Sequence, residues 1–212
     1  MEGLSTGRLR LPNGRAPGGL GLVQELVNTS VRPTDDHPPR VADLLATADS
    51  AAAWLAAALG QWAGATGQAA PAIGLGPADL APLRRLRESV RALAGESPDG
   101  GFQPSGLGGL SVAVQFDASG RCRYGTTAAG WRGVAALVAA EILLAQHSGA
   151  WERFRTCPYP VCGIAFYDES KNNSRVWHDV RTCGNRTNLA ASRGRRRGGG
   201  AEAAGVATVR SD

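Results

Sequence analysis

The amino-acid sequence predicts an α+β protein that is mostly helical, with a helical N-terminal domain, one small β-hairpin and a compact metal-stapled module near the C-terminus. Apolar residues recur at helical spacing in several segments. One pair of short runs alternates in polarity around a turn, as hairpins do. Three cysteines and a histidine stand in two close pairs, Cys157-x4-Cys162 and His178-x4-Cys183.

Two helices are expected in the first third of the chain. Residues 21–29 form a short apolar element that predicts a short helix. A second helix is expected to be capped by Asp43 or Asp49 and to end near Gly60, before a Gly- and Ala-rich linker over residues 63–76. Residues 1–19, rich in glycine, proline and arginine, are expected to be disordered.

Two further helices have stronger patterns. Pro77 at the start and Gly95 past the end enclose leucines and a valine at helical spacing. Residues 131–147 carry a broad apolar stripe that is closed by Ser148 and Gly149.

Residues 112–124 predict the β-hairpin. Val112, Val114 and Phe116 alternate with small or polar residues, residues 117–120 form the turn, and alternation resumes on the return. Cys122 lies there between two arginines, and is interpreted as a core or edge cysteine, with a reactive thiol as the alternative.

The two ligand pairs favour a tetrahedral Zn²⁺ site of Cys157, Cys162, His178 and Cys183. A knuckle at residues 157–163, a strand at 164–168 and a helix beginning at Ser174 are expected around it. Four protein ligands leave no open position, so a structural role is favoured over a catalytic one. Buried free thiols and a redox switch that ejects the metal remain alternatives.

Charge is concentrated around these ligands. Residues 1–150 hold 12 basic and 12 acidic residues, whereas residues 151–197 hold nine arginines and Lys171 against four acidic residues, a net of +6. Such clustering is typical of proteins that bind polyanions. No signal peptide, membrane span or P-loop, GxSxG, HExxH or Rossmann motif is found, so we expect a cytoplasmic protein that is not an enzyme.

Four blocks in order resemble a CGNR-type zinc finger: Cys-x4-Cys, Phe166-x-Asp168-x-Ser170, Ser174-Arg175-x-Trp177-His178 and Cys183-Gly184-Asn185-Arg186. Residues 25–29 resemble the opening segment of the ABATE domain, which precedes such fingers in bacterial transcription regulators. The resemblance implies a stress- or ligand-sensing domain and a DNA-binding finger. His178 stands where the family usually has cysteine, and imidazole is an accepted zinc ligand. In two other places the chain departs from the family pattern, at Val180 and Asn188.

The predicted domains are a disordered segment at 1–19, an ABATE-like sensor domain at 20–150, a CGNR finger at 151–193 and a flexible tail at 194–212. The candidate contacts to double-stranded DNA are Lys171, Arg175, Arg181, Asn185, Arg186, Arg193 and Arg195. Arg175 or Arg186 has an alternative role as a clamp on Asp168 or on backbone around the zinc.

The candidate effector-binding residues are Asn28, Thr29, Trp54 and Trp131, for which helix capping and core packing are the alternatives. For the whole chain, two alternatives to a DNA-binding regulator stay open. One is a zinc-stapled module that binds protein or RNA. The other is a small-molecule-binding or enzymatic domain with an appended finger.

Overall fold

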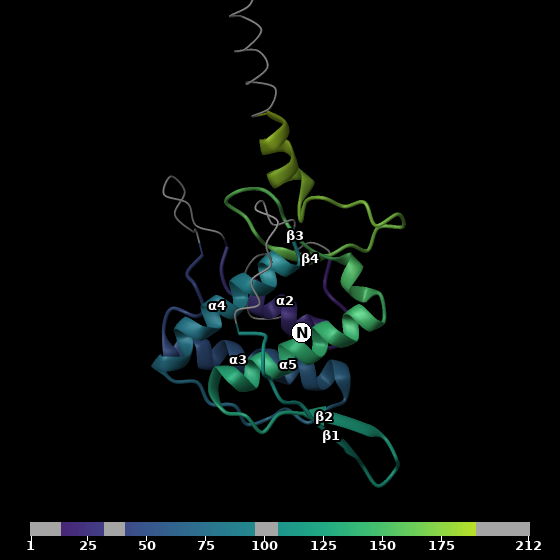
Figure 1. The fold of residues 1–212 in the computed structure, drawn as a ribbon. Coiled ribbons are helices and arrows are strands. Elements are labelled where there is room, and N and C mark those ends of the chain that lie inside the picture. The colour runs from purple at the N-terminus through teal and green to yellow at the C-terminus, as the bar shows by residue number, and fades with distance from the viewer. Residues whose placement is uncertain (1–13, 32–40, 96–105, 190–212) are drawn as a thin grey trace, which may run out of the picture. The chain divides into compact units, whose positions relative to one another are not determined.

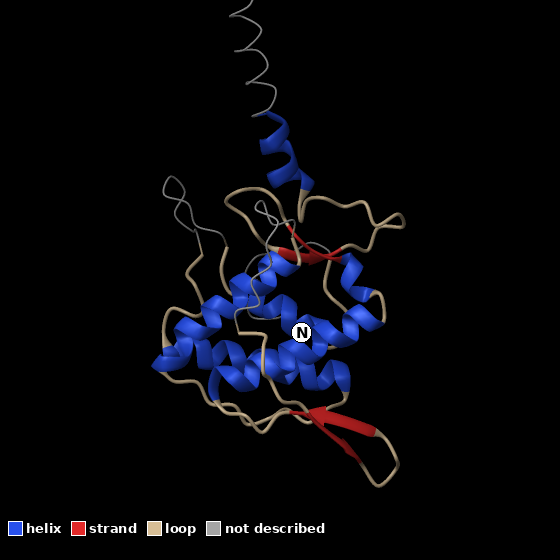
Figure 2. Ribbon diagram, in the orientation of Figure 1, coloured by secondary structure: helices blue, strands red, loops and turns tan. Residues whose placement is uncertain are grey.

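The computed structural model describes residues 14–31, 41–95 and 106–189. The chain divides into two compact units, Met1–His178 and Asp179–Asp212. Figures 1 and 2 show helices as the main element of the first unit, with two short antiparallel pairs of strands. The predicted α+β, mostly helical class is confirmed. No helix in the described part of the chain is long and apolar enough to cross a membrane.

Helix α2 (Leu20–Val27) forms the centre of the first unit, as its place among the other helices in Figure 1 shows. It packs against α3 (Ala48–Thr66), α4 (Pro77–Leu93), α5 (Gly130–His147) and the strand β4 (Ala165–Tyr167). Val23, Leu26 and Val27 are fully buried in it. This helix is surrounded on several sides, so even its polar residues Gln24 and Glu25 are buried.

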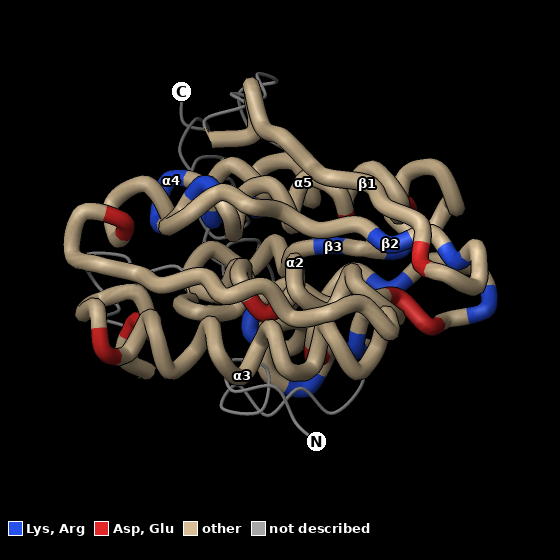
Figure 3. Tube along the Cα trace, turned by 90° about the horizontal axis from the view of Figure 1, so that it is seen from below, with Lys and Arg blue, Asp and Glu red and all other residues tan. Residues whose placement is uncertain are grey.

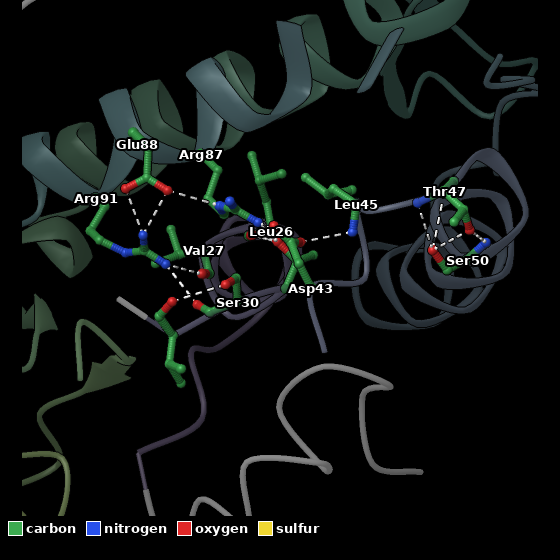
Figure 4. Close-up of polar contacts among 12 residues, drawn as sticks. Leu26, Val27, Ser30, Asp43, Leu45, Thr47, Ser50, Arg87, Glu88 and Arg91 are labelled. Carbon is green, nitrogen blue, oxygen red and sulfur yellow. Dashed lines mark hydrogen bonds and ion pairs between the residues drawn. The ribbon is translucent and has the colours of Figure 1, made fainter. Parts of the chain in front are cut away.

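Helix α3 differs from the prediction at both ends. Thr47 caps it in a reciprocal pair with Ser50, in place of Asp43 or Asp49 (Figure 4). Asp43 instead accepts hydrogen bonds from the backbone of Leu45 and from the Arg87 guanidinium. The helix continues through the exposed Gly60 to Thr66 and ends at Gly67, which has a φ of 68°. Burial of Trp62 outweighs the low helix propensity of Gly60.

Helices α4 and α5 lie where the sequence predicts them. Pro77 opens α4, and its leucines at 80, 83 and 86 are buried with Val90. Asp79 accepts hydrogen bonds from the backbone N–H of Gly76 at 2.8 Å and of Trp131 at 2.9 Å. The same carboxylate therefore binds the N-terminal backbone of both helices, and α4 packs against α5.

The predicted hairpin consists of β1 (Ala113–Phe116) and β2 (Cys122–Gly125). Its register pairs Ala113 with Gly125, Val114 with Tyr124, Gln115 with Arg123, and Phe116 with Cys122. Tyr124 connects the hairpin to the helices, because its hydroxyl and the indole N–H of Trp62 both donate to Oε1 of the buried Glu141, at 2.5 and 2.6 Å. Burial and this carboxylate raise the pKa of Tyr124 far above its usual range.

A second pair of strands follows α5. The 3-10 helix η1 (Ala150–Arg153) leads into β3 (Phe154–Thr156), which pairs with β4 in the register 154–167, 155–166 and 156–165. β4 confirms the predicted strand, whereas β3 was not predicted. Residues 14–19 were expected to be disordered, yet Gly14 accepts a hydrogen bond from Tyr167 N–H at 2.8 Å and Ala16 N–H donates to Gln24.

Polar side chains of α2 and its C-cap residue hold β4. Asn28 donates to the Ala165 carbonyl at 3.1 Å and accepts from the Ala165 N–H at 2.8 Å. Gln24 donates to the same carbonyl at 3.1 Å. All three residues are almost completely buried. These contacts attach the C-terminal pair of strands to the helical core.

Arg91 of α4 makes the second attachment, and Figure 4 shows its contacts with Val27, Ser30 and Glu88. Its Nη2 donates to the carbonyls of Val27 and Ser30, its Nη1 to the Glu88 carboxylate, and its Nε to the carbonyl of Gly163 at 3.2 Å. The side chain is 2% exposed. An arginine side chain carries five N–H donors, and these five contacts equal that number.

We predict that Asn28→Ala lowers the free energy of unfolding by about 2–3 kcal/mol, since the Ala165 N–H remains buried without an acceptor. Urea denaturation followed by circular dichroism measures this. Gln146→Ala, on the exposed side of α5, is the control and should change stability by less than about 0.5 kcal/mol. Equal stability of the two variants would contradict the role of Asn28.

Candidate metal centre

The four predicted ligands come together. One ligand atom from each of Cys157, Cys162, His178 and Cys183 lies within 4.8 Å of the others, and all four residues are buried. The Cys162 Sγ is 3.3 Å from Nδ1 of His178. In a tetrahedral zinc site, ligand sulfurs lie about 3.8 Å apart and a sulfur and a nitrogen about 3.6 Å apart. The separations therefore suit a metal ion.

The first two ligands lie in the loop of the β3–β4 hairpin. Thr156 pairs with Ala165, and Cys157 N–H donates to the Ile164 carbonyl at 2.9 Å, so the chain leaves the strands at Cys157. Cys162 N–H donates to the Tyr159 carbonyl at 2.9 Å, which closes a tight turn. Gly163 then takes a φ of 63°, a conformation that disfavours other residues. The predicted knuckle is confirmed in these residues.

His178 lies in a loop rather than on a helix. The prediction of a helix beginning at Ser174 is wrong, because residues 174–179 are not helical. The Arg175 N–H donates to Asp168 at 2.7 Å, and the Arg175 guanidinium donates to the carbonyls of Trp177 and His178 while lying 5.1 Å from the centre of the Phe166 ring. These contacts, made across the hairpin, fix the loop in an extended path that presents the imidazole.

Asp168 is the buried anion that organises this loop. Its Oδ1 accepts from Ser170 N–H at 2.8 Å and its Oδ2 from Arg175 N–H at 2.7 Å. Burial raises the pKa of Asp168, but hydrogen bonds from Ser170 and Arg175 and the positive charge of Arg155 outweigh that effect, so the pKa lies below its usual value. A charged carboxylate is therefore the stable form at neutral pH.

Cys183 belongs to the second unit. A helical segment begins after Asp179, whose side chain caps it by accepting from Arg181 N–H at 2.9 Å. The turn Val180–Gly184 is π-helical and residues 185–189 are α-helical. Cys183 N–H donates to the Asp179 carbonyl at 3.0 Å. The helix predicted around Cys183 therefore exists, but it starts six residues after Ser174.

The donor set limits the chemistry of the centre. Three sulfurs and one imidazole are soft to borderline ligands, which suit zinc better than magnesium or calcium. Four protein ligands fill a tetrahedral shell, so no position remains where a substrate or water would be activated. The centre can hold a metal ion and, through it, four chain positions.

The predicted DNA contacts fall into three groups. Lys171, Arg181, Asn185 and Arg186 are exposed, and their side chains make no hydrogen bond or ion pair with any other described residue. Arg175 is half-buried and donates to the carbonyls of Trp177 and His178, which are the contacts of the alternative role, a clamp on backbone around the metal ligands. Arg193 and Arg195, like the predicted tail at 194–212, lie outside the described residues.

The four predicted effector-binding residues have partners within the protein. Asn28 is engaged with Ala165, and Thr29 donates to the Leu26 carbonyl and accepts from Arg87. Trp54 is fully buried in the core, and Trp131 packs against that core from its edge. Polar partners thus engage Asn28 and Thr29, and the two tryptophan rings pack on the core, but the buried indole N–H of Trp54 has no hydrogen-bond partner among the described residues.

Two contacts that support the site are not evident from the sequence. Arg91 reaches the Gly163 carbonyl of the knuckle, and Gln24 reaches β4. A signal for Arg91 exists in the sequence, because it occupies the apolar face of α4 eight residues after Leu83. A charged residue at such a position is buried only when it is paired. No local pattern identifies its partners.

Two family models match the chain in succession. The ABATE model, described as "Putative stress-induced transcription regulator", matches residues 20–152. The CGNR zinc finger model matches residues 153–196. No curated protein matches the chain. The order of the two matches is the one that the sequence blocks predict.

We predict that Asp168→Asn destabilises the protein by about 1–3 kcal/mol at pH 7, because an amide replaces an acceptor-only carboxylate facing two N–H donors. The folded-state pKa of Asp168 is lowered, so its stabilising effect is present above the unfolded pKa of about 3.9 and is lost as the pH falls through the folded value. The stability difference between wild type and variant should therefore shrink below about pH 4. Urea titrations at several pH values measure it, with the exposed Asp49→Asn as control. A difference that is independent of pH would contradict the assignment.

We also predict that His178→Ala abolishes binding of the metal, measured as metal per chain by mass spectrometry after purification, from about one to well below one. His147→Ala is the matched control, because His147 is exposed at the end of α5 and lies outside the cluster. Unchanged metal content in the His178 variant would remove it from the ligand set.

Proposed function

The chain belongs to the ABATE family, and from this membership and the geometry of its CGNR zinc finger we propose that it is a DNA-binding transcriptional regulator. In this proposal a structural Zn²⁺ is held by Cys157, Cys162, His178 and Cys183. The finger binds double-stranded DNA, and residues 20–152 receive a stress signal or a small-molecule effector.

The observation that carries the proposal is the position of three exposed side chains. Arg181, Asn185 and Arg186 flank the metal ligand Cys183 on one short helical segment. Arginine grips phosphate and reads guanine, and asparagine reads adenine. Their side chains make no hydrogen bond with other described residues, so binding DNA would break no contact among them.

Charge supports the same reading. The net charge of +6 over residues 151–197 contrasts with the neutral residues 1–150. In Figure 3 basic and acidic residues of the helical region alternate, and neither sign dominates it. A phosphate-binding surface is therefore best sought in the finger, where four arginines also follow between residues 193 and 197.

Binding of an effector beside α2 would influence the finger through the contacts of that helix with β4. A pocket of about 340 Å³ lies between α2 and α3, lined among others by Gln24, Glu25 and Trp62. Gln24 also donates to the carbonyls of Gly14 and Ala165. A ligand that moved the Gln24 amide would disturb β4, which carries the knuckle.

The filled zinc shell favours a regulator without catalytic activity, and its thiolates favour a reducing cytoplasm.

We predict that the double variant Arg181→Ala/Arg186→Ala binds duplex DNA more weakly and with a slope of log K against log salt that is smaller by about 1.8, since each lost phosphate contact contributes about 0.9. Fluorescence anisotropy at several salt concentrations measures both quantities. Arg84→Ala/Arg85→Ala, two exposed arginines of α4, is the matched control.

Three outcomes would contradict the proposal. The first is DNA affinity that both double variants lower equally. The second is equal affinity of the wild type for duplex DNA and single-stranded RNA, which would favour a general polyanion binder. The third is a loss of metal from the Arg181/Arg186 variant, which would identify the arginines as supports of the zinc site.

A further inference from the structure

Strand β1 and the residue before it carry exposed apolar side chains at three alternate positions. Val112, Val114 and Phe116 are 37%, 60% and 73% exposed. Alternate residues of a strand share one face of the sheet, so the three side chains form one stripe. In Figure 1 the hairpin extends away from the helices, and α2 to α5 do not cover it. A two-stranded sheet is at best marginally stable alone, so a projecting hairpin gains stability when further strands pair with it.

The same residues direct their backbone groups outward. Tyr124 N–H donates to the Gln68 side chain at 3.3 Å, so it points away from β1. Antiparallel pairs alternate between hydrogen-bonded and non-hydrogen-bonded, and the pair of Val114 and Tyr124 is therefore of the second kind. Phe116 is in the same position opposite Cys122. The N–H and C=O groups of Val114 and Phe116 thus face the free edge of β1, and no described residue binds them.

The sequence places neither a charge nor a proline on this edge. Residues 106–116 contain no charged residue and no proline, the two devices that usually keep edge strands apart. Figure 3 shows β1 without a charged position. The other edge of the hairpin is partly occupied, because the Gln68 side chain accepts from the Tyr124 N–H and the Gly67 carbonyl accepts from the Arg123 side chain. When only the β1 edge is available for pairing, two molecules use it on each other, which gives a closed dimer and no fibre.

We infer that β1 pairs with β1 of a second copy of this chain, antiparallel and about a two-fold axis, to form a four-stranded sheet in the order β2–β1–β1–β2. Two equal edges without charge meet without repulsion, which favours a second copy over a charged partner. The inference rests on the hairpin alone and is independent of the proposed DNA binding.

The register follows from the parity of the strand. Only even-numbered residues offer outward N–H and C=O groups, so even residues must lie opposite even residues. Among these registers, the one centred on Val114 places it opposite itself and sets Val112 opposite Phe116 of the second copy. Both outward-facing residues, Val114 and Phe116, are then used, and with Val112 their side chains form one continuous apolar stripe across both copies. Cys122 and Tyr124, opposite Phe116 and Val114, line the same face.

Analytical ultracentrifugation of the zinc-loaded full chain tests the inference. We expect a concentration-dependent dimer for wild type. Val114→Glu brings two carboxylates together at the two-fold axis and should weaken the dimer by roughly tenfold or more. Gln115→Glu adds the same charge on the opposite face, beside Arg123, and should remain dimeric. Far-ultraviolet circular dichroism verifies that both variants keep their helices.

A cysteine cross-link tests the register in folded protein. In a Cys122→Ser background, Val114→Cys should form a disulfide-linked dimer under mild oxidation, because residues opposite each other lie within the usual Cα spacing of a disulfide. Gln115→Cys in the same background should not. A wild type that stays monomeric at all concentrations, equal dimerisation of the two glutamate variants, or equal cross-linking at 114 and 115 would each overturn the inference.

Discussion

The backbone of Ala165 meets the side chains of Asn28 and Gln24 in a region from which water is excluded. Peptide groups buried in this way are stable only when they are paired, and β3 alone cannot supply both edges of β4. The side chains of the central helix therefore complete the strand. Because β4 positions the knuckle and the Phe166–Arg175 contact, the geometry of the metal ligands depends on polar residues more than 130 positions earlier in the chain.

Local patterns predict those parts of the fold whose causes are local. Pro77, the leucines of α4 and the alternation in the hairpin each act within a few residues, and these elements lie where they are expected. The end of α3 depends on the burial of Trp62, and the loop before His178 depends on the contacts of Arg175 with Asp168 and with the carbonyls of Trp177 and His178. β3 is three residues long and exists because β4 pairs with it. Such tertiary causes leave no period in the sequence.

The metal ligands could be predicted because a chelating pair must be close in sequence to form a small loop, and the chemistry restricts it to few residue types. For the candidate effector residues the sequence signal is ambiguous. Asn28 and Thr29 correctly indicate polar groups inside an apolar element, but the same signal arises whether the partner is a ligand or a distant strand. Arg175 shows the same ambiguity between phosphate and backbone carbonyl, and its two carbonyl contacts depend on the path of residues 174–178.

Arg91 has a consequence for how such proteins can be divided and recombined. The two family matches meet at residues 152 and 153, yet the guanidinium of Arg91, on one side of that junction, uses its Nε on Gly163, on the other. A fragment that ended at the junction would leave this donor and the amides of Gln24 and Asn28 facing solvent. The boundary between the two family matches is thus not a boundary between independently folding parts. A different C-terminal partner for this helical domain would have to bring its own strand with a carbonyl at each of these points.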